Sequence, residues 1–293
     1  MDSLEAVNRL KRAGRFADAL QTLESSTASQ RKHPDIQLLK VELLERVGRH
    51  AQSSALAALL MKSRELSASQ RSLCEYAIGR TALEAGDTDS GVAHLQRAIS
   101  FAKEGNDLER LCWTQIALLL VLADRSGPQA AVPLLAELRL TTLKHGDPQT
   151  VAALHLFVGE MEAKYGRFDS AQRHAVVAQR VLATSENVWL DSVCENLLLA
   201  ISILRSDAKS GLSHGLRALE LAGQAGTAST LRACLGNLGN LFHALGDFDR
   251  AIDYFDRALT ALPSHGEKNN ATLDSPARTR MDQNELDQSA RLL

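Results

Sequence analysis

The sequence predicts an all-α protein built as a right-handed solenoid of helix-turn-helix repeats, with about seven full copies and a partial eighth. The first observation is a series of small or turn-forming residues, the last five of which are separated by 40, 40, 40 and 38 residues. We call these residues hinges: Gly14, Gly48, Gly86, Ser126, Gly166, Ser206, Gly246 and Asn284. Such a period is typical of stacked helical hairpins, which offer a binding surface rather than a catalytic pocket.

The position five residues after each hinge is the second observation. It is always small, occupied by Ala19, Ser53, Gly91, Ala131, Ala171, Gly211, Ala251 and Ser289. One amphipathic helix has no reason to keep a small side chain at a fixed place over eight periods. A shared packing geometry does, because a small side chain lets two helix backbones approach closely in every copy.

Composition is the third observation. Hydrophobic residues make up 45% of the 293 residues but aromatic residues only 4%, and runs of Val, Ile and Thr typical of strands are missing. A net charge of −2, without a recurring Arg or Lys stripe, argues against a nucleic-acid-binding surface. No apolar run is long enough to span a bilayer, and residues 1–5 do not resemble a signal peptide. We therefore expect a cytoplasmic protein that does not bind membranes.

The hinges divide the chain into pairs of helices, the first ending at the hinge and the second beginning just after it. The expected pairs are 2–13 and 15–28, 35–46 and 49–64, 68–85 and 88–104, 107–125 and 129–144, 148–165 and 168–184, 187–205 and 208–224, and 228–245 and 248–262. Glycine suits these helix ends because it adopts the left-handed conformation readily. Pro128 and Pro148 stand near expected helix starts, which proline tolerates, whereas Pro133 is expected to kink or delay its helix.

Residues 237–251, which read NLGNLFHALGDFDRA, form the clearest copy. Followed by Phe255 and Pro263, they resemble a nearly complete tetratricopeptide repeat (TPR). The copies around Gly86 and Gly166 match in part, and the others are degenerate. The resemblance covers essentially the whole chain, but a period of about 40 is longer than the usual period of about 34. It implies longer helices, as in the TPR-like arrays of bacterial regulators and of motor-protein light chains.

The end of the chain suggests a boundary. We expect residues 1–263 to form the superhelical array and residues 264–293 to begin an eighth repeat. That copy stops inside its second helix, where Leu286, Leu292 and Leu293 would lack a cover. Natural solenoids normally end in a polar capping helix, so we interpret the chain as part of a longer protein. The alternative is that residues 264–293 are a flexible natural tail.

Residues that could support catalysis or metal binding form no recognisable constellation. The four cysteines, Cys74, Cys112, Cys194 and Cys234, lack zinc-ligand spacing. The nine histidines form no known metal motif, and no phosphate-binding or nucleophile-elbow motif occurs. We therefore expect buried thiols, no metal or other cofactor, and no enzymatic activity.

The TPR resemblance implies a concave surface built mainly from the first helix of each repeat, where ligands usually bind. Residues six, ten and thirteen before the hinges should line it, together with His243. The candidate groove residues are Leu73, Tyr76, Arg80, Trp113, Ile116, Leu120, Leu156, Glu160, Asn196, Asn240 and His243. We expect an extended peptide or an amphipathic helix to bind there. Apolar contacts would provide the affinity, and Asn side chains would hydrogen-bond to the backbone of the ligand. The alternative is that longer helices shift the register and make the apolar residues inter-repeat core.

Three functions fit these features. The first is the N-terminal sensory or interaction module of a bacterial signalling or transcriptional regulator. The second is a stand-alone adaptor that assembles a complex and could form a homo-oligomer. The third is a receptor for a peptide signal. In each case the expected partner is a protein or a peptide.

Overall fold

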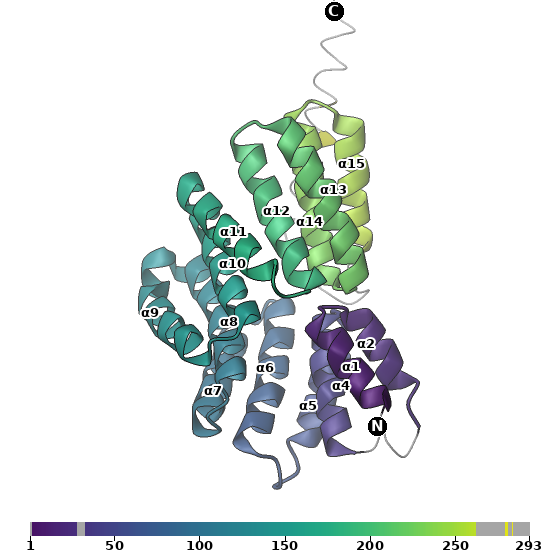
Figure 1. Ribbon diagram of the computed structural model, residues 1–293, viewed down its shortest axis with the longest axis vertical. Helices are drawn as coiled ribbons and strands as arrows, with labels where there is room; N and C mark the ends of the chain where they lie inside the picture. Colours follow the sequence, from purple (N-terminus) through teal and green to yellow (C-terminus); the bar gives the residue numbers. More distant parts are fainter. Residues whose placement is uncertain (1, 28–32, 262–278, 281–282, 284–293) are drawn as a thin grey trace, which may run out of the picture.

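The computed structural model describes residues 2–27, 33–261, 279–280 and 283, and within them it contains fourteen helices and no strands. The helices follow one another as antiparallel hairpins (Figure 1). The hairpins are α1 (Asp2–Arg12) with α2 (Phe16–Glu24), α4 (Pro34–Arg46) with α5 (His50–Leu60), α6 (Ala68–Glu84) with α7 (Thr88–Glu104), α8 (Leu108–Ser126) with α9 (Pro128–His145), α10 (Pro148–Lys164) with α11 (Phe168–Leu182), α12 (Val188–Leu204) with α13 (Ala208–Ala225), and α14 (Ala228–Ala244) with α15 (Phe248–Thr260). The expected all-α solenoid is confirmed.

Most of the hinges predicted from the period are turns with positive φ. They are Gly14, Gly48, Gly86, Gly166, Ser206 and Gly246. The prediction for Ser126 is wrong by one residue, because Ser126 ends α8 and Gly127 has a φ of 80°. A residue before proline is disfavoured in the helical region, so Gly127, which precedes Pro128, leaves the helix instead. Asn284 lies outside the described residues.

Pro133 does not change where the second helix of the fourth hairpin begins. Pro133 lies inside α9, which begins at Pro128 and ends at His145. The expected delay of this helix therefore does not occur.

In several copies the small residue at the recurring position is in close contact with the residue twelve positions earlier. The Ser53 hydroxyl donates a 2.7 Å hydrogen bond to the carbonyl oxygen of Val41 on the preceding helix. A Cβ atom added to Gly79 would lie 3.1 Å from the carbonyl oxygen of Gly91. The expected close backbone approach is confirmed at these pairs, and Ser289 lies outside the described residues.

The solenoid curves far enough for its first hairpin to contact the N-terminal ends of α10 and α12 and the turn between α13 and α14 (Figure 1). The amide of Val188 donates a 3.0 Å hydrogen bond to the carbonyl oxygen of Ala13. Side chains of Asn187 and Gln149 both donate to the carbonyl oxygen of Arg12, at 3.2 and 2.9 Å. We call this set of contacts the closure contact. The sequence period did not predict it.

Ion pairs connect α1, α4 and α8 next to the closure contact. Glu42 of α4 forms ion pairs with Lys11 of α1 at 2.8 Å and with Arg110 of α8 at 3.5 Å. Burial alone would raise the pKa of the Glu42 carboxyl, but Arg110 and Lys11 outweigh it and hold that pKa at about 2. Glu42 is therefore ionised and joins three elements of the curved array.

Candidate ligand groove

The inner surface of the curve contains two adjoining hollows. The first encloses about 280 Å³ and is lined mainly by α4, α6, α8, α10, α12 and α14. The second encloses about 520 Å³ between α10, α12, α14 and α15. Glu160, Val193, Asn196 and Ala233 line both hollows. We call the combined depression the inner groove.

Most of the candidate groove residues border this depression. Those that line the first hollow are Tyr76, Arg80, Trp113, Ile116, Leu120, Glu160 and Asn196. Leu156 and Asn240 line the second hollow, together with Glu160 and Asn196. Leu73 and His243 line neither. Leu73 packs in a cluster with Leu38 and Val41, and the His243 ring lies 5.5 Å from the Phe248 ring.

The apolar candidates form walls that are mostly buried between repeats. Tyr76 is 6% exposed, Ile116 is 3% exposed and Leu156 is 1% exposed. Each therefore belongs to the packing of the array and offers only a small area to the groove. Direct contact between these residues and a ligand stays a prediction.

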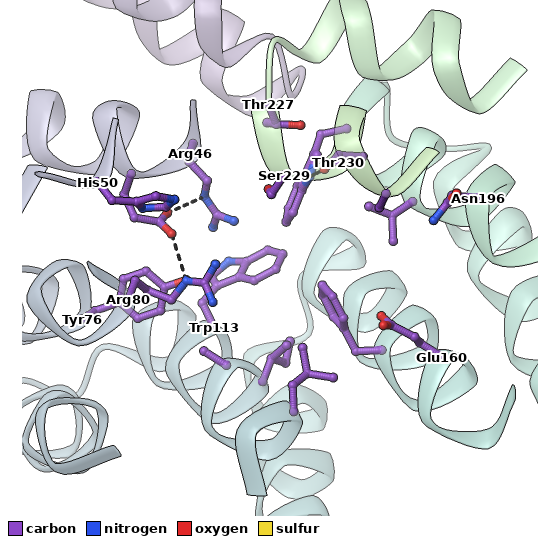
Figure 2. A pocket seen from close by; sticks show the side chains of 18 residues that line it. Arg46, His50, Tyr76, Arg80, Trp113, Glu160, Asn196, Thr227, Ser229 and Thr230 are labelled. Carbon is purple, nitrogen blue, oxygen red and sulfur yellow. Dashed lines mark hydrogen bonds and ion pairs between the residues drawn. The ribbon is translucent and has the colours of Figure 1, made fainter. Parts of the chain in front are cut away.

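Several residues of the first hollow were not anticipated from the sequence. They are Glu45, Arg46, His50, Trp189, Thr227, Ser229 and Thr230, most of which are labelled in Figure 2. They lie at the ends of helices, beyond the offsets that were used to choose groove residues. Only Trp189 could have been suspected from the sequence, because the chain has two tryptophans and the other, Trp113, was already a candidate groove residue.

The two tryptophans surround an arginine. The Arg46 guanidinium carbon lies 4.7 Å from the ring centroids of both Trp113 and Trp189. The Trp189 ring also packs edge-on against Phe16 of the first hairpin, with ring centroids 5.7 Å apart. Cation–π attraction stabilises such an arrangement. The closure contact and the first hollow therefore share the Trp189 side chain.

A second arginine of the hollow is paired with carboxylates. Arg80 Nε donates to Glu45 at 3.2 Å, and another nitrogen of its guanidinium lies 3.6 Å from Glu84. Burial raises the pKa of the neighbouring Tyr76 hydroxyl and lowers that of His50. At neutral pH the tyrosine and histidine are accordingly uncharged.

The described residues offer little for covalent chemistry. All four cysteines are buried, and burial raises the pKa of Cys74 to about 11 and those of Cys194 and Cys234 to about 12. Their thiols are therefore protonated and poorly nucleophilic at neutral pH. Within the described part of the chain, no three His, Cys, Asp or Glu side chains are grouped to hold a metal ion. Among the described helices, none combines the length and the apolar character that crossing a membrane requires.

Comparison with known proteins identifies the repeat type. Residues 233–265 match the sequence family described as tetratricopeptide repeat. No curated protein sequence matches the chain.

Solved structures match over most of this chain. The APC/C hetero-tetramer Cut9–Hcn1 matches with a TM-score of 0.66 and 16% identity, over 96% of this chain and 49% of the other. A Rap protein complexed with Competence and Sporulation Factor matches with a TM-score of 0.62 and 11% identity, over 99% and 85% of the two chains. A signal transduction ATPase with numerous domains, which has a tetratricopeptide repeat sensor and comes from Pyrococcus horikoshii, matches with a TM-score of 0.55 and 14% identity, over 84% and 39%. This chain thus spans about half of the first structure and less of the third, and at these identities the likeness concerns the fold.

Proposed function

We propose that this chain, in which residues 233–265 match the tetratricopeptide repeat, binds a peptide segment of a partner protein along the inner groove. In this role it serves as the interaction or sensory module of a bacterial signalling or transcriptional regulator. The observation that carries the proposal is the continuity of the two hollows, which share four lining residues. A continuous groove suits an extended segment better than a compact small molecule.

The polar residues of the groove support a peptide ligand. Asn237 donates a 3.1 Å hydrogen bond to the side-chain oxygen of Asn196, and exposed Asn240 lines the same hollow. Each Asn amide can donate and accept hydrogen bonds, so these side chains can pair with the main chain of an extended peptide. The apolar walls around Leu156 and Val193 can bind its side chains.

The regulatory part of the proposal draws on what the similar structures are named for. One is a signalling ATPase with a repeat sensor, and another is a Rap protein in complex with a signalling factor. Both share the fold of this chain at low identity. These similarities favour a sensory or interaction role as the proposal, although fold alone does not determine function.

A peptide selection followed by a blocking substitution tests the binding proposal. Peptides are selected from a display library on the purified chain, and their affinities are then measured for Ala233→Trp. Ala233 is exposed and lines both hollows, so a Trp there fills the groove without entering the core. Ala58→Trp, at an exposed position of α5, is the matched control.

We expect Ala233→Trp to abolish binding of the selected peptides and Ala58→Trp to leave it unchanged. Both variants should retain the melting temperature of the parent chain. Peptides that bind equally well to both variants would place the binding surface outside the groove and refute the proposal.

A further inference from the structure

The first hollow contains a group of polar side chains that the peptide proposal does not use. They come from opposite ends of the array, since Arg46 and His50 flank the second hinge whereas Thr227 and Ser229 stand at the start of α14. The curvature of the array brings them together. A Cβ atom added to Gly48, between Arg46 and His50, would lie 3.1 Å from the Cβ atom of Ala228.

Arg46 carries a charge that is compensated only at longer range, by Glu45 and Glu42. Its side chain is 12% exposed, and its ion pair with Glu45 is long, with 4.0 Å between Nε and the carboxylate oxygen. Among the described residues, no hydrogen bond is formed by its guanidinium. The faces of Trp113 and Trp189 attract the positive charge, but they do not replace five hydrogen-bond acceptors.

Two further groups beside Arg46 have unused hydrogen-bonding capacity. Thr227 is 2% exposed, and its hydroxyl has no hydrogen-bond partner within the described part of the chain. The Nδ1 atom of His50 is also buried without a partner there. Leaving such groups buried and unpaired costs stability, and both residues line the first hollow.

The start of α14 adds a favourable electrostatic field. Thr227 is its N-cap residue but forms no side-chain cap hydrogen bond. The first N–H groups of a helix lack partners inside the helix, and its dipole favours a negative charge near them. Thr227 and Ser229 stand at this end of α14, and both residues line the hollow.

We propose that Arg46, His50, Thr227 and Ser229 form a binding subsite for a carboxylate attached to an apolar group, located where the two ends of the array meet. This inference rests on the proposed function, because it assigns the chemistry that holds one end of the bound segment. A carboxylate presents two oxygens and a single negative charge, which matches the one poorly compensated guanidinium. A phosphate dianion suits the site less well, because Glu45 and Glu160 line the same hollow.

The rest of the hollow determines the size and character of the attached group. Ile116, Leu120, Phe157 and Val193 supply an apolar lining, and the enclosed volume is about 280 Å³. A volume of this size accommodates a short aliphatic chain or one apolar side chain. A ligand with a carboxylate and a short apolar body therefore fits better than a free inorganic anion.

Intrinsic fluorescence provides a direct assay of this subsite. Trp113 and Trp189 are the only tryptophans of the chain, and both line the hollow. The fluorescence of the full chain is titrated with hexanoate, with hexanamide, which has the same carbon chain without the charge, and with hexyl phosphate. We expect hexanoate to bind at least about tenfold more tightly than hexanamide and more tightly than hexyl phosphate.

Thr227→Val removes the unpaired hydroxyl while keeping the shape of the side chain. We expect it to weaken hexanoate binding by about tenfold and to leave the melting temperature unchanged or raised. Thr141→Val is the matched control, because Thr141 is a buried threonine of α9 that does not line the hollow. It should leave hexanoate binding unchanged.

Equal binding of hexanoate and hexanamide, no binding of either, or an unchanged affinity in Thr227→Val would each overturn the carboxylate subsite. Tighter binding of hexyl phosphate than of hexanoate would also overturn it. These outcomes concern the first hollow alone. Failure of the peptide proposal is recognised separately, by selected peptides that still bind to Ala233→Trp.

Discussion

The contacts between the two helices of each hairpin differ in kind from the closure contact. The paired helices approach through small residues at a constant offset from the hinge, as at Gly79 of α6 and Gly91 of α7. The closure contact instead uses hydrogen bonds to the backbone of Arg12 and Ala13 and the aromatic ring of Trp189. The first kind repeats along the chain, whereas the second occurs once and joins residues about 175 positions apart.

This difference shows how a repeat array acquires a specific site. Repetition produces a curved surface whose neighbouring parts are alike. The closure contact breaks that equivalence, because it brings the N-terminal and C-terminal parts of the array to the same hollow. Substitutions at positions that are equivalent by sequence but different in the structure can therefore separate the two kinds of contact.

The largest expected effect comes from the hinge glycines. Gly14 and Gly166 occupy equivalent hinges with φ values of 71° and 75°. A Cβ atom on Gly14 would lie 2.8 Å from the backbone nitrogen of Trp189, whereas a Cβ atom on Gly166 would meet nothing within 4 Å. We expect Gly166→Ala to lower the free energy of unfolding by about 1–2 kcal/mol from backbone strain, and Gly14→Ala by roughly 2–5 kcal/mol because a steric clash is added.

Denaturant unfolding followed by circular dichroism measures both glycine variants. The difference between the two losses in unfolding free energy, rather than either loss alone, measures the contribution of the closure contact. Equal destabilisation would mean that the first hairpin does not pack against α12 in solution.

A somewhat smaller effect is expected from the charge network beside the closure contact. Its basis is the Glu42 pKa, which is lowered from 4.5 to about 2. Because the folded-state pKa is the lower one, the stabilisation is fully present above pH 4.5 and is lost as the pH falls toward 2. We expect Glu42→Gln to lower the free energy of unfolding at pH 7 by about 3 kcal/mol, and this difference from the parent chain to shrink with acidification.

The Glu42 prediction is checked by urea unfolding at a series of pH values. Glu5→Gln, at an exposed position of α1, is the control. A Glu42→Gln deficit that does not change between pH 7 and pH 3 would contradict the role of the ionised carboxylate.

The small-residue contacts within hairpins predict a comparable but local loss. Ala171 is fully buried between helices, so Ala171→Leu forces extra volume into a close contact and should cost roughly 1–3 kcal/mol. Ala58→Leu, at an exposed position, should be nearly neutral. Differential scanning calorimetry measures both, and a neutral Ala171→Leu would contradict the packing constraint inferred from the repeat.

The smallest expected effect is a gain in stability. Gln115 is 0% exposed, and neither its amide nitrogen nor its amide oxygen has a partner among the described residues. In two other repeats the equivalent position pairs with a histidine nineteen residues later, as Glu75 does with His94 and Glu195 with His214. Nineteen residues after Gln115 stands Leu134, which cannot accept or donate.

We therefore expect Gln115→Met, which has a similar volume, to raise the free energy of unfolding by about 1 kcal/mol. Thermal unfolding measures the change. A loss of stability would show that the Gln115 amide is satisfied in solution.

The regular part of the fold was predictable from the sequence because its signal is repeated. Gly14, Gly86 and Gly246 each mark a turn with positive φ, and an error at one copy can be recognised from the others. The misplacement of Ser126 arose because a period locates a turn only to within a residue, whereas the proline at position 128 fixes it.

The groove was predictable in part. Tyr76, Trp113 and Asn196 do line the first hollow, since the offset rule identifies the inner faces of the first helices. The rule could not find Arg46 or Thr227, because their proximity depends on the total curvature accumulated over several hairpins. Small angular differences between copies determine that curvature, and no local pattern of residues encodes it.

Hydrogen–deuterium exchange with a selected peptide tests most directly the claim that a partner binds the inner groove. We expect slower amide exchange in α8, α10, α12 and α14, whose residues line the groove, and no change in α9 and α11, whose residues line neither hollow. Protection confined to α9 and α11, with unchanged exchange in the four groove helices, would contradict this claim.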